Sequence, residues 1–260
     1  MRKDVRKAAL AAALAVTVGV GGLVAMPTTA EAGFGGIGKI AGDAVGIGDS
    51  GGKVDIEGLT KRQNQLLTNL VYSTALLQMS AGDMDAALGL GLGLQGHTAN
   101  QNAAVKSVVS GGDAGKMLKF SQDMNNSFGD KKAQEDTQQK IQSKLKETMS
   151  SGDKAKLEQL DGVIRQAKAE RTVSDTLVAA AAIDAVKIIK DANSVIKGGG
   201  DVVAQAKQIL DTTKAAQTLL KQRSAVSKML KTATKEYEKT RKVEISSDDK
   251  KKAEQSVGKE

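Results

Sequence analysis

The stretch Leu177 to Ile189, LVAAAAIDAVKII, is the most apolar part of the chain beyond its N-terminal segment, and it decides the fold. Its 13 residues fall short of the roughly 20 apolar residues that a helix needs to cross a bilayer. Two charged residues, Asp184 and Lys187, also lie inside it. We therefore expect a helix buried at the centre of a bundle, with a membrane-inserting segment as the alternative.

Helical periodicity continues on both sides of this stretch. Apolar residues recur at helical intervals from Leu157 to Ala167 and again from Leu177 to Ile196, before Gly198-Gly199-Gly200 ends the pattern. A second long helix is expected from Val202 to Tyr237, with Asp201 as its N-cap. Two long helices joined at three glycines predict a C-terminal antiparallel helical hairpin with coiled-coil-like packing.

The segment before this hairpin indicates shorter helices separated by glycine. Leu59 to Ser80 has the pattern of one amphipathic helix, which we expect to break at Gly82-Asp83. Asp83 would then be the N-cap of a second helical region that ends at Val109. Inside that region Leu88 to Leu94 reads LGLGLGL. In a helix, glycines four residues apart would let another helix approach closely, whereas a cost of about 1 kcal/mol per glycine favours a kink or loop.

Further glycines divide the rest of the chain. Asp113, Asp130 and Asp153 each follow a glycine and are expected to start new helices. The helix from Lys131 to Ser150 is strongly polar and is predicted to be solvated on most of its surface. Ser246 to Glu260 is rich in Lys, Glu, Asp and Ser, which predicts a charged, disordered tail.

The composition agrees with a helical protein. The 260 residues include one proline, no cysteine, no tryptophan and 2% aromatic residues. An all-β fold relies on aromatic, β-branched and turn-forming residues, whereas abundant Ala, Lys, Gln and Leu with no proline after Pro27 favour long helices. We therefore predict an all-α fold, an elongated helical bundle over residues 57–245 that is stabilised by helix packing without disulfides.

The first 32 residues have the order of an export signal. A basic stretch from Met1 to Lys7 precedes an uncharged run from Ala8 to Ala25, followed by a proline and the tripeptide Ala30-Glu31-Ala32. Cleavage between Ala32 and Gly33 would yield a periplasmic or secreted protein, and an uncleaved membrane anchor is the alternative. A lipoprotein is excluded because the chain has no cysteine to acylate.

Residues 33–56 are rich in glycine and are expected to form a flexible leader. Gly38, Gly42 and Gly46 fall four residues apart, as in a glycine zipper. A segment that contacts membrane is therefore the alternative for this leader.

The chain is basic, with a formal net charge of +8. The signal carries four basic and two acidic residues, so its loss leaves +6. Such a protein is drawn to anionic lipids, cell-wall polymers or acidic partners. Nucleic acid is not expected, because the basic residues are interleaved with Asp, Glu and Gln, no aromatic platform for base stacking accompanies them, and export removes the chain from the genome.

Lysines that recur along the last long helix suggest a membrane or cell-wall role, although acidic neighbours also fit a solvated face. These lysines are Lys221, Lys228, Lys231, Lys235 and Lys239.

Two glycine patterns resemble nucleotide-binding loops but lack the required context. Gly33 to Ile40, GFGGIGKI, has Ile40 where a phosphate loop needs Ser or Thr for magnesium, and its preceding strand would be the cleaved signal. Gly91 to Gly96, GLGLQG, fits G-x-G-x-x-G with Asp113 following, but helices rather than a βαβ unit are expected around it. We expect no nucleotide and no other cofactor.

The sequence also offers no convincing residues for catalysis or metal binding. His97 is the single histidine, and zinc sites usually need several His or Cys ligands. No nucleophile elbow accompanies it, and the pairs Asp83/Asp85 and Asp248/Asp249 lack the spacing of a calcium loop. We name no catalytic, cofactor-binding or metal-binding residue and expect a protein that is not an enzyme.

These observations lead to one functional expectation and one alternative. We expect an exported, non-enzymatic helical protein that acts as an envelope or secreted scaffold or adaptor, binding a partner protein or a second copy through its helices. The alternative is a membrane-active protein, resembling helical pore-forming toxins, that inserts the glycine-rich leader or Leu88 to Leu94 into lipid.

Overall fold

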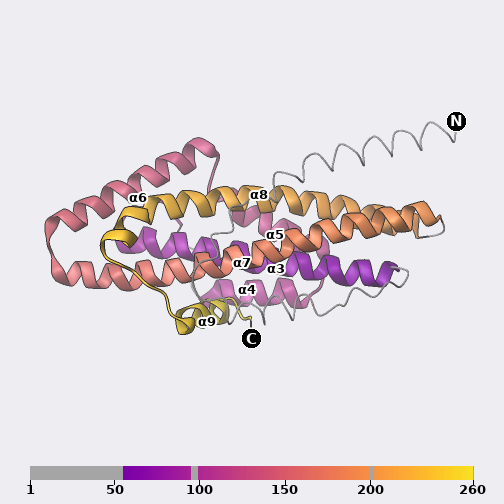
Figure 1. Ribbon diagram of the computed structural model, residues 1–260, viewed down its shortest axis with the longest axis horizontal. Helices are drawn as coiled ribbons and strands as arrows, with labels where there is room; N and C mark the ends of the chain where they lie inside the picture. The colour runs from indigo at the N-terminus through magenta and orange to yellow at the C-terminus, as the bar shows by residue number, and fades with distance from the viewer. Residues whose placement is uncertain (1–54, 95–98, 200–201, 260) are drawn as a thin grey trace. The chain divides into compact units, whose positions relative to one another are not determined.

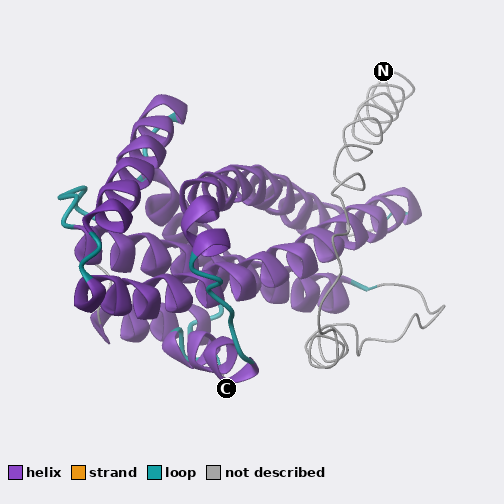
Figure 2. Cartoon of the chain, turned by 60° about the vertical axis from the view of Figure 1, so that its left-hand side comes forward, coloured by secondary structure: helices purple, strands orange, loops and turns teal. Residues whose placement is uncertain are grey.

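The computed structural model of the protein describes residues 55–94, 99–199 and 202–259. Within these ranges the chain forms seven helices and no strand (Figure 1, Figure 2), which confirms the predicted all-α helical bundle. The helices are α3 (Ile56–Leu88), α4 (Ala99–Ser110), α5 (Ala114–Asn126), α6 (Lys131–Ser151), α7 (Lys154–Gly198), α8 (Val203–Thr240) and α9 (Ser247–Ser256).

Helix α7 contacts most of the other helices and contains the stretch that decides the fold. It packs along α3 and α8 and also touches α9. Leu177, Ala181, Ala185 and Ile188 are at most 2% exposed, at the spacing of one helix face. The small alanines on this face allow neighbouring helices to approach closely. The prediction of a core helix is therefore confirmed for this face of the stretch.

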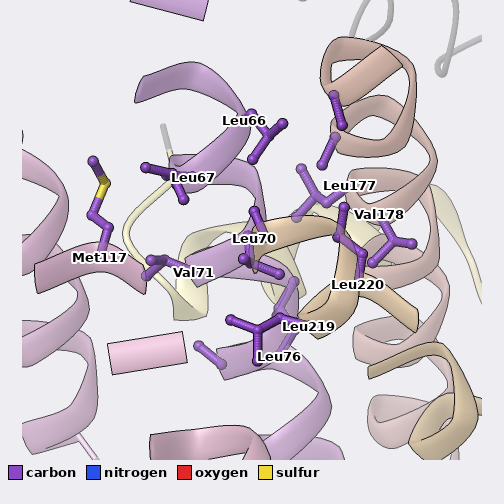
Figure 3. Close-up of a cluster of buried hydrophobic side chains, with 14 of the residues drawn as sticks. Leu66, Leu67, Leu70, Val71, Leu76, Met117, Leu177, Val178, Leu219 and Leu220 are labelled. Atoms are coloured by element: carbon purple, nitrogen blue, oxygen red, sulfur yellow. The ribbon is translucent and has the colours of Figure 1, made fainter. Parts of the chain in front are cut away.

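Side chains from four helices meet in the core (Figure 3). Leu70 of α3, Leu177 of α7 and Leu220 of α8 belong to one buried cluster. Met117 of α5 belongs to the same cluster, and Leu67 is the α3 leucine on that side of the helix. Burial of one such side chain contributes about 2 kcal/mol. A second buried cluster joins α3, α6, α7 and α8 around residues such as Leu77, Ile141 and Leu157.

Helices α7 and α8 run in opposite directions. Asp175 pairs with Arg223, whereas Asp161, nearer the start of α7, pairs with Arg241 just beyond the end of α8. This is the order of partners in antiparallel helices (Figure 1). Helix α7 ends in the predicted glycine run, at Gly198. The expected cap Asp201 lies outside the described residues.

The predicted helix starts at three aspartates are confirmed. Each aspartate accepts a hydrogen bond from the backbone N–H three residues later, at 3.0 Å for Asp113, 2.9 Å for Asp130 and 3.1 Å for Asp153. Such a cap satisfies an N–H group that has no partner inside the helix.

The expected break at Gly82-Asp83 is wrong, because α3 continues through both residues to Leu88. Ala81 and Met84 are at most 1% exposed in the second buried cluster. The Oγ atom of Ser80 also donates a hydrogen bond to the carbonyl oxygen of Ala167 on α7, at 3.0 Å. Packing against α7 therefore outweighs the cost of one helical glycine, about 1 kcal/mol.

The prediction of one helical region from Asp83 to Val109 is also wrong, because a loop separates the end of α3 at Leu88 from α4. Gly89, Gly91 and Gly93 have φ angles of 62°, 64° and 72°, in the left-handed region that glycine adopts without strain. The LGLGLGL run therefore forms a loop after its first leucine, as the loop interpretation predicted, and provides no helical surface on which another helix could pack.

The disordered tail expected over 246–260 is wrong as well, because Ser247–Ser256 forms α9. Ser246 and Asp249 form a reciprocal capping box at its start. Ala253 and Val257 are at most 1% exposed and belong to the first buried cluster. Two apolar residues four positions apart give this charged segment one face that packs on the bundle.

Candidate functional site

A buried polar network joins α3, α7 and α8. The guanidinium of Arg223 donates from Nη1 to Oδ1 of Asp175 at 2.8 Å and from Nη2 to Oγ of Ser174, which in turn donates to the carbonyl oxygen of Ser73. Ser227 Oγ donates to the same Asp175 oxygen at 2.7 Å. Burial lowers the pKa of Arg223, an effect that the Asp175 charge opposes. The network is a contact between helices in which Arg223 is buried and Asp175 is half exposed.

A second polar contact between α7 and α8 lies closer to the end of α8. Arg171 Nη2 is 2.8 Å from Glu238 Oε1, and Lys168 Nζ is 3.4 Å from Glu238 Oε2. Burial acts to raise the pKa of Glu238, but the Arg171 charge and hydrogen bonds outweigh it, so the pKa is lowered. Lys168 Nζ also donates to the carbonyl oxygen of Val243 at 2.6 Å. These bonds hold the segment after α8 against α7.

The third contact is built on Asp161 at the start of α7. Its Oδ1 accepts a hydrogen bond from the Tyr237 hydroxyl at 2.8 Å and its two oxygens face the Arg241 guanidinium. The hydrogen bond from Arg241 lowers the pKa of Asp161. Because the three contacts require specific partners at successive positions, we infer that they set the register between α7 and α8.

Two buried carboxyl groups retain an oxygen without a hydrogen-bond partner among the described residues. Glu170, 1% exposed, accepts from Gln166 Nε2 at 2.9 Å on Oε1, whereas its Oε2 has none. Burial raises its pKa to about 8. Asp184, 7% exposed, likewise has an unpartnered Oδ2 and a pKa raised by burial. They lie 14 positions apart on α7, about 21 Å along the helix axis, so they do not form a catalytic pair.

The part of the G-x-G-x-x-G pattern that the structure describes is bound by the protein itself. Oδ1 of the buried Asp85 accepts from the backbone N–H of Leu92 at 2.9 Å, and Oδ2 accepts from that of Leu94 at 3.1 Å. In a phosphate loop, backbone N–H groups of this kind would face the ligand. Here the two N–H groups donate to the carboxylate of Asp85 instead, so this loop is held against the end of α3.

The remaining motifs fall into two groups. The export signal at 1–32, the glycine zipper, the loop at 33–40 and His97 lie outside the described residues. Of the two carboxylate pairs, Asp85 binds the loop and Asp249 caps α9. Elsewhere in the described chain, no three His, Cys, Asp or Glu side chains lie close enough to hold a metal ion together.

The most exposed apolar surface on α7 is a short stripe that we call the α7 face. Ile183 is 53% exposed and Val186 is 41% exposed, one helical turn apart. Ala179 is exposed and Ala182 half-buried beside them. We expected the whole of Leu177 to Ile189 to lie in the core, whereas one side of this stretch faces outward in the structure.

A row of lysines on α8 forms a second exposed surface, which we call the lysine face. All five lysines singled out in the sequence are exposed, and the structure adds Lys207 and Lys214. The two additional lysines extend a series with a constant interval of seven residues, which the sequence already contains: Lys207, Lys214, Lys221, Lys228 and Lys235. The complete lysine face is Lys207, Lys214, Lys221, Lys228, Lys231, Lys235 and Lys239.

Among the helices that the structure describes, none is both long and apolar enough to cross a membrane. Comparisons of the chain with protein-family models, with curated proteins and with solved structures find no match.

Proposed function

We propose that the chain is an exported, non-enzymatic helical protein that acts as a scaffold or adaptor in the envelope or outside the cell. It binds a partner protein, or a second copy of itself, through the outside of its bundle. The observation that carries this proposal is the α7 face, where Ile183 and Val186 are exposed on the helix that otherwise forms the core.

The α7 face has the chemistry of a helix-docking surface. Ala179, Ile183 and Val186 are spaced by four and three residues, the interval at which side chains contact a second helix. The neighbouring alanine at 182 is small enough to allow close approach. Isolated exposed apolar residues are common on protein surfaces, so the continuity of the stripe is what supports binding.

Site-specific photo-crosslinking in the producing cells tests this proposal. A photoreactive amino acid at Ala179 should give a crosslinked species that disappears in the variant Ile183→Asp/Val186→Asp. The matched control is Val202→Asp/Val203→Asp, which places the same charges on the exposed valines at the start of α8. Loss of the crosslink in both variants, or in neither, would contradict a specific α7 face.

The size of the crosslinked species separates the two kinds of partner. A species of twice the mass of the chain, together with concentration-dependent association of the purified protein, identifies a second copy. Any other mass identifies a different protein. Circular dichroism should show the same helical content for both variants, because all four substituted residues are at least 37% exposed.

Export itself is tested by mass spectrometry. The mature protein in the envelope or medium should begin at Gly33, and an intact Met1 in that fraction would contradict cleavage of the signal.

Insertion of the Leu-Gly loop into lipid is a second candidate function. Leu90 and Leu92 are only half-buried in this loop, which Asp85 holds through two backbone N–H groups. If the loop enters lipid, Asp85→Ala should release more dye from anionic vesicles than the wild-type chain. No release by either protein would contradict it.

A further inference from the structure

The lysine face is a row of exposed positive charges along α8. Five of its members are spaced at seven residues, or close to two helical turns, and Lys231 and Lys239 stand beside them. From Lys207 to Lys239 the row extends for about 48 Å, at 1.5 Å per residue. The row therefore runs along most of the helix.

This row points directly away from the core. The residue two positions after each of the five regularly spaced lysines is buried, and two positions correspond to a rotation of about 200° around a helix. These buried residues are Ile209, Ala216, Arg223, Leu230 and Tyr237. The lysine side chains are thus held on the outer side of α8 by the packing of the opposite side.

The lysine face is not neutralised by the protein. None of its seven ammonium groups lies within 4 Å of a carboxylate among the described residues. Asp211 lies one helical turn from Lys207 and Lys214, and Glu236 lies one turn before Lys239, so both acidic side chains border the row without forming an ion pair with it. Glu238 pairs with α7. An extended anionic surface is therefore the complementary partner.

The chemistry of the row favours a lipid surface over a discrete anion site. Arginine is suited to gripping a single phosphate through two parallel hydrogen bonds, but Arg223, the only arginine of α8, is buried. The lysine face instead presents separate exposed point charges along the helix, which suit a surface made of many headgroups. Tyr237, the only aromatic residue of α8, is also buried, which leaves no platform for stacking nucleotide bases.

We propose that the lysine face docks the protein onto an anionic lipid surface through electrostatic contact with phosphate headgroups, without insertion. The apolar side of α8 stays in the bundle core during this contact. This inference goes beyond the scaffold function, since it concerns α8 and does not require the α7 face. Each lysine close to an anionic membrane strengthens binding about fivefold.

Vesicle co-sedimentation of the full chain tests the proposal. The probe is a vesicle of equal parts phosphatidylcholine and phosphatidylglycerol, compared with phosphatidylcholine alone. The variant Lys214→Gln/Lys221→Gln/Lys228→Gln/Lys235→Gln should bind the anionic vesicle about 600-fold more weakly than the wild type, and salt should abolish wild-type binding.

The matched control removes four exposed lysines from α3, α4, α6 and α7, with the same change in net charge. It is Lys61→Gln/Lys106→Gln/Lys132→Gln/Lys190→Gln, and we expect it to weaken binding less than about fivefold. Both variants should keep wild-type helicity and melting temperature, which shows that they fold. The variant Ile183→Asp/Val186→Asp should bind anionic vesicles like the wild type. The proposal for the α7 face and the proposal for the lysine face can therefore be rejected independently of each other.

Three results would overturn the inference. The first is an equal loss of binding in the two lysine variants, which would indicate net charge alone. The second is equal binding of the wild type to neutral and anionic vesicles. The third is release of the wild type from vesicles by soluble polyphosphate at the same phosphate concentration, which would assign the lysine face to an anionic polymer.

Discussion

Arg223 of α8 and Asp175 of α7 form an ion pair of 2.8 Å whose members differ sharply in exposure. The arginine side chain is 1% exposed, whereas the aspartate side chain is 50% exposed. Removal of the aspartate would leave a buried charge without its partner, but removal of the arginine would leave a carboxylate that water can solvate. The two halves of this pair are therefore not equivalent for stability.

We predict that Asp175→Ala lowers the free energy of unfolding by about 3 kcal/mol, whereas Arg223→Met, which keeps most of the volume, changes it by less than about 1 kcal/mol. Urea unfolding followed by circular dichroism measures both. The double variant should match Arg223→Met, since no buried charge remains. A larger loss for Arg223→Met than for Asp175→Ala would contradict this explanation.

We predict that burial of Glu170 makes the stability of the protein depend on pH. Its pKa is raised from 4.5 to about 8 by burial. Between these values the folded protein holds a proton that the unfolded chain has lost, so this group makes the free energy of unfolding fall as pH rises from 4.5 to 8. Glu170→Gln removes the titration and should raise stability at pH 8 by roughly 3 kcal/mol, with little effect near pH 4.

Unfolding of this variant across the pH range provides the measurement. Glu158→Gln, on the exposed side of the same helix, is the control for loss of one carboxyl group. The prediction fails if Glu170→Gln and Glu158→Gln have parallel pH profiles.

The Leu-Gly loop depends on the buried carboxylate of Asp85. Asp85→Ala leaves the N–H groups of Leu92 and Leu94 without their acceptor, which should cost about 2 to 3 kcal/mol. Hydrogen exchange at these two amides should accelerate together with the loss of stability. Asp83→Ala, at an exposed position on the same helix, should leave both amides protected, and equal exchange in the two variants would count against a specific role for Asp85.

Helix α9 should stabilise the bundle through its single apolar face. Ala253 is fully buried, so Ala253→Asp places an unpaired charge in the first buried cluster and should detach α9. We expect faster proteolysis within 246–259 and a loss of about 2 to 3 kcal/mol. Lys251→Asp, on the exposed side, should change neither; the same cleavage rate for both variants would mean that the contact of α9 does not stabilise the protein.

Local signals allowed much of the helical architecture to be predicted. Asp113, Asp130 and Asp153 mark helix starts because a capping side chain acts on an N–H only three residues away. The end of α7 at Gly198 follows from the three glycines in the same way. Gly82 failed as a local signal, because the neighbouring Ala81 and Met84 pack in the core.

The candidate surfaces were only partly visible in the pattern of residues. The lysines of α8 are visible in the sequence, but only their exposure in the structure shows that they form a surface. The buried residues on the opposite side of α8 account for this exposure. The α7 face could not be predicted, since Ile183 and Ile188 have the same side chain and only the neighbours of Ile188 bury it.

By itself, the sequence determined that this protein is helical, where most of its helices start, and that its last long helix is rich in lysine. These features depend on intrinsic propensity and on capping within a few residues of the chain. The tertiary structure alone decided that α3 continues through Gly82, that α9 packs on the bundle, and that Arg223 and Glu170 are buried. Burial depends on residues distant in the sequence, and its free energy is large enough to override a local preference of about 1 kcal/mol.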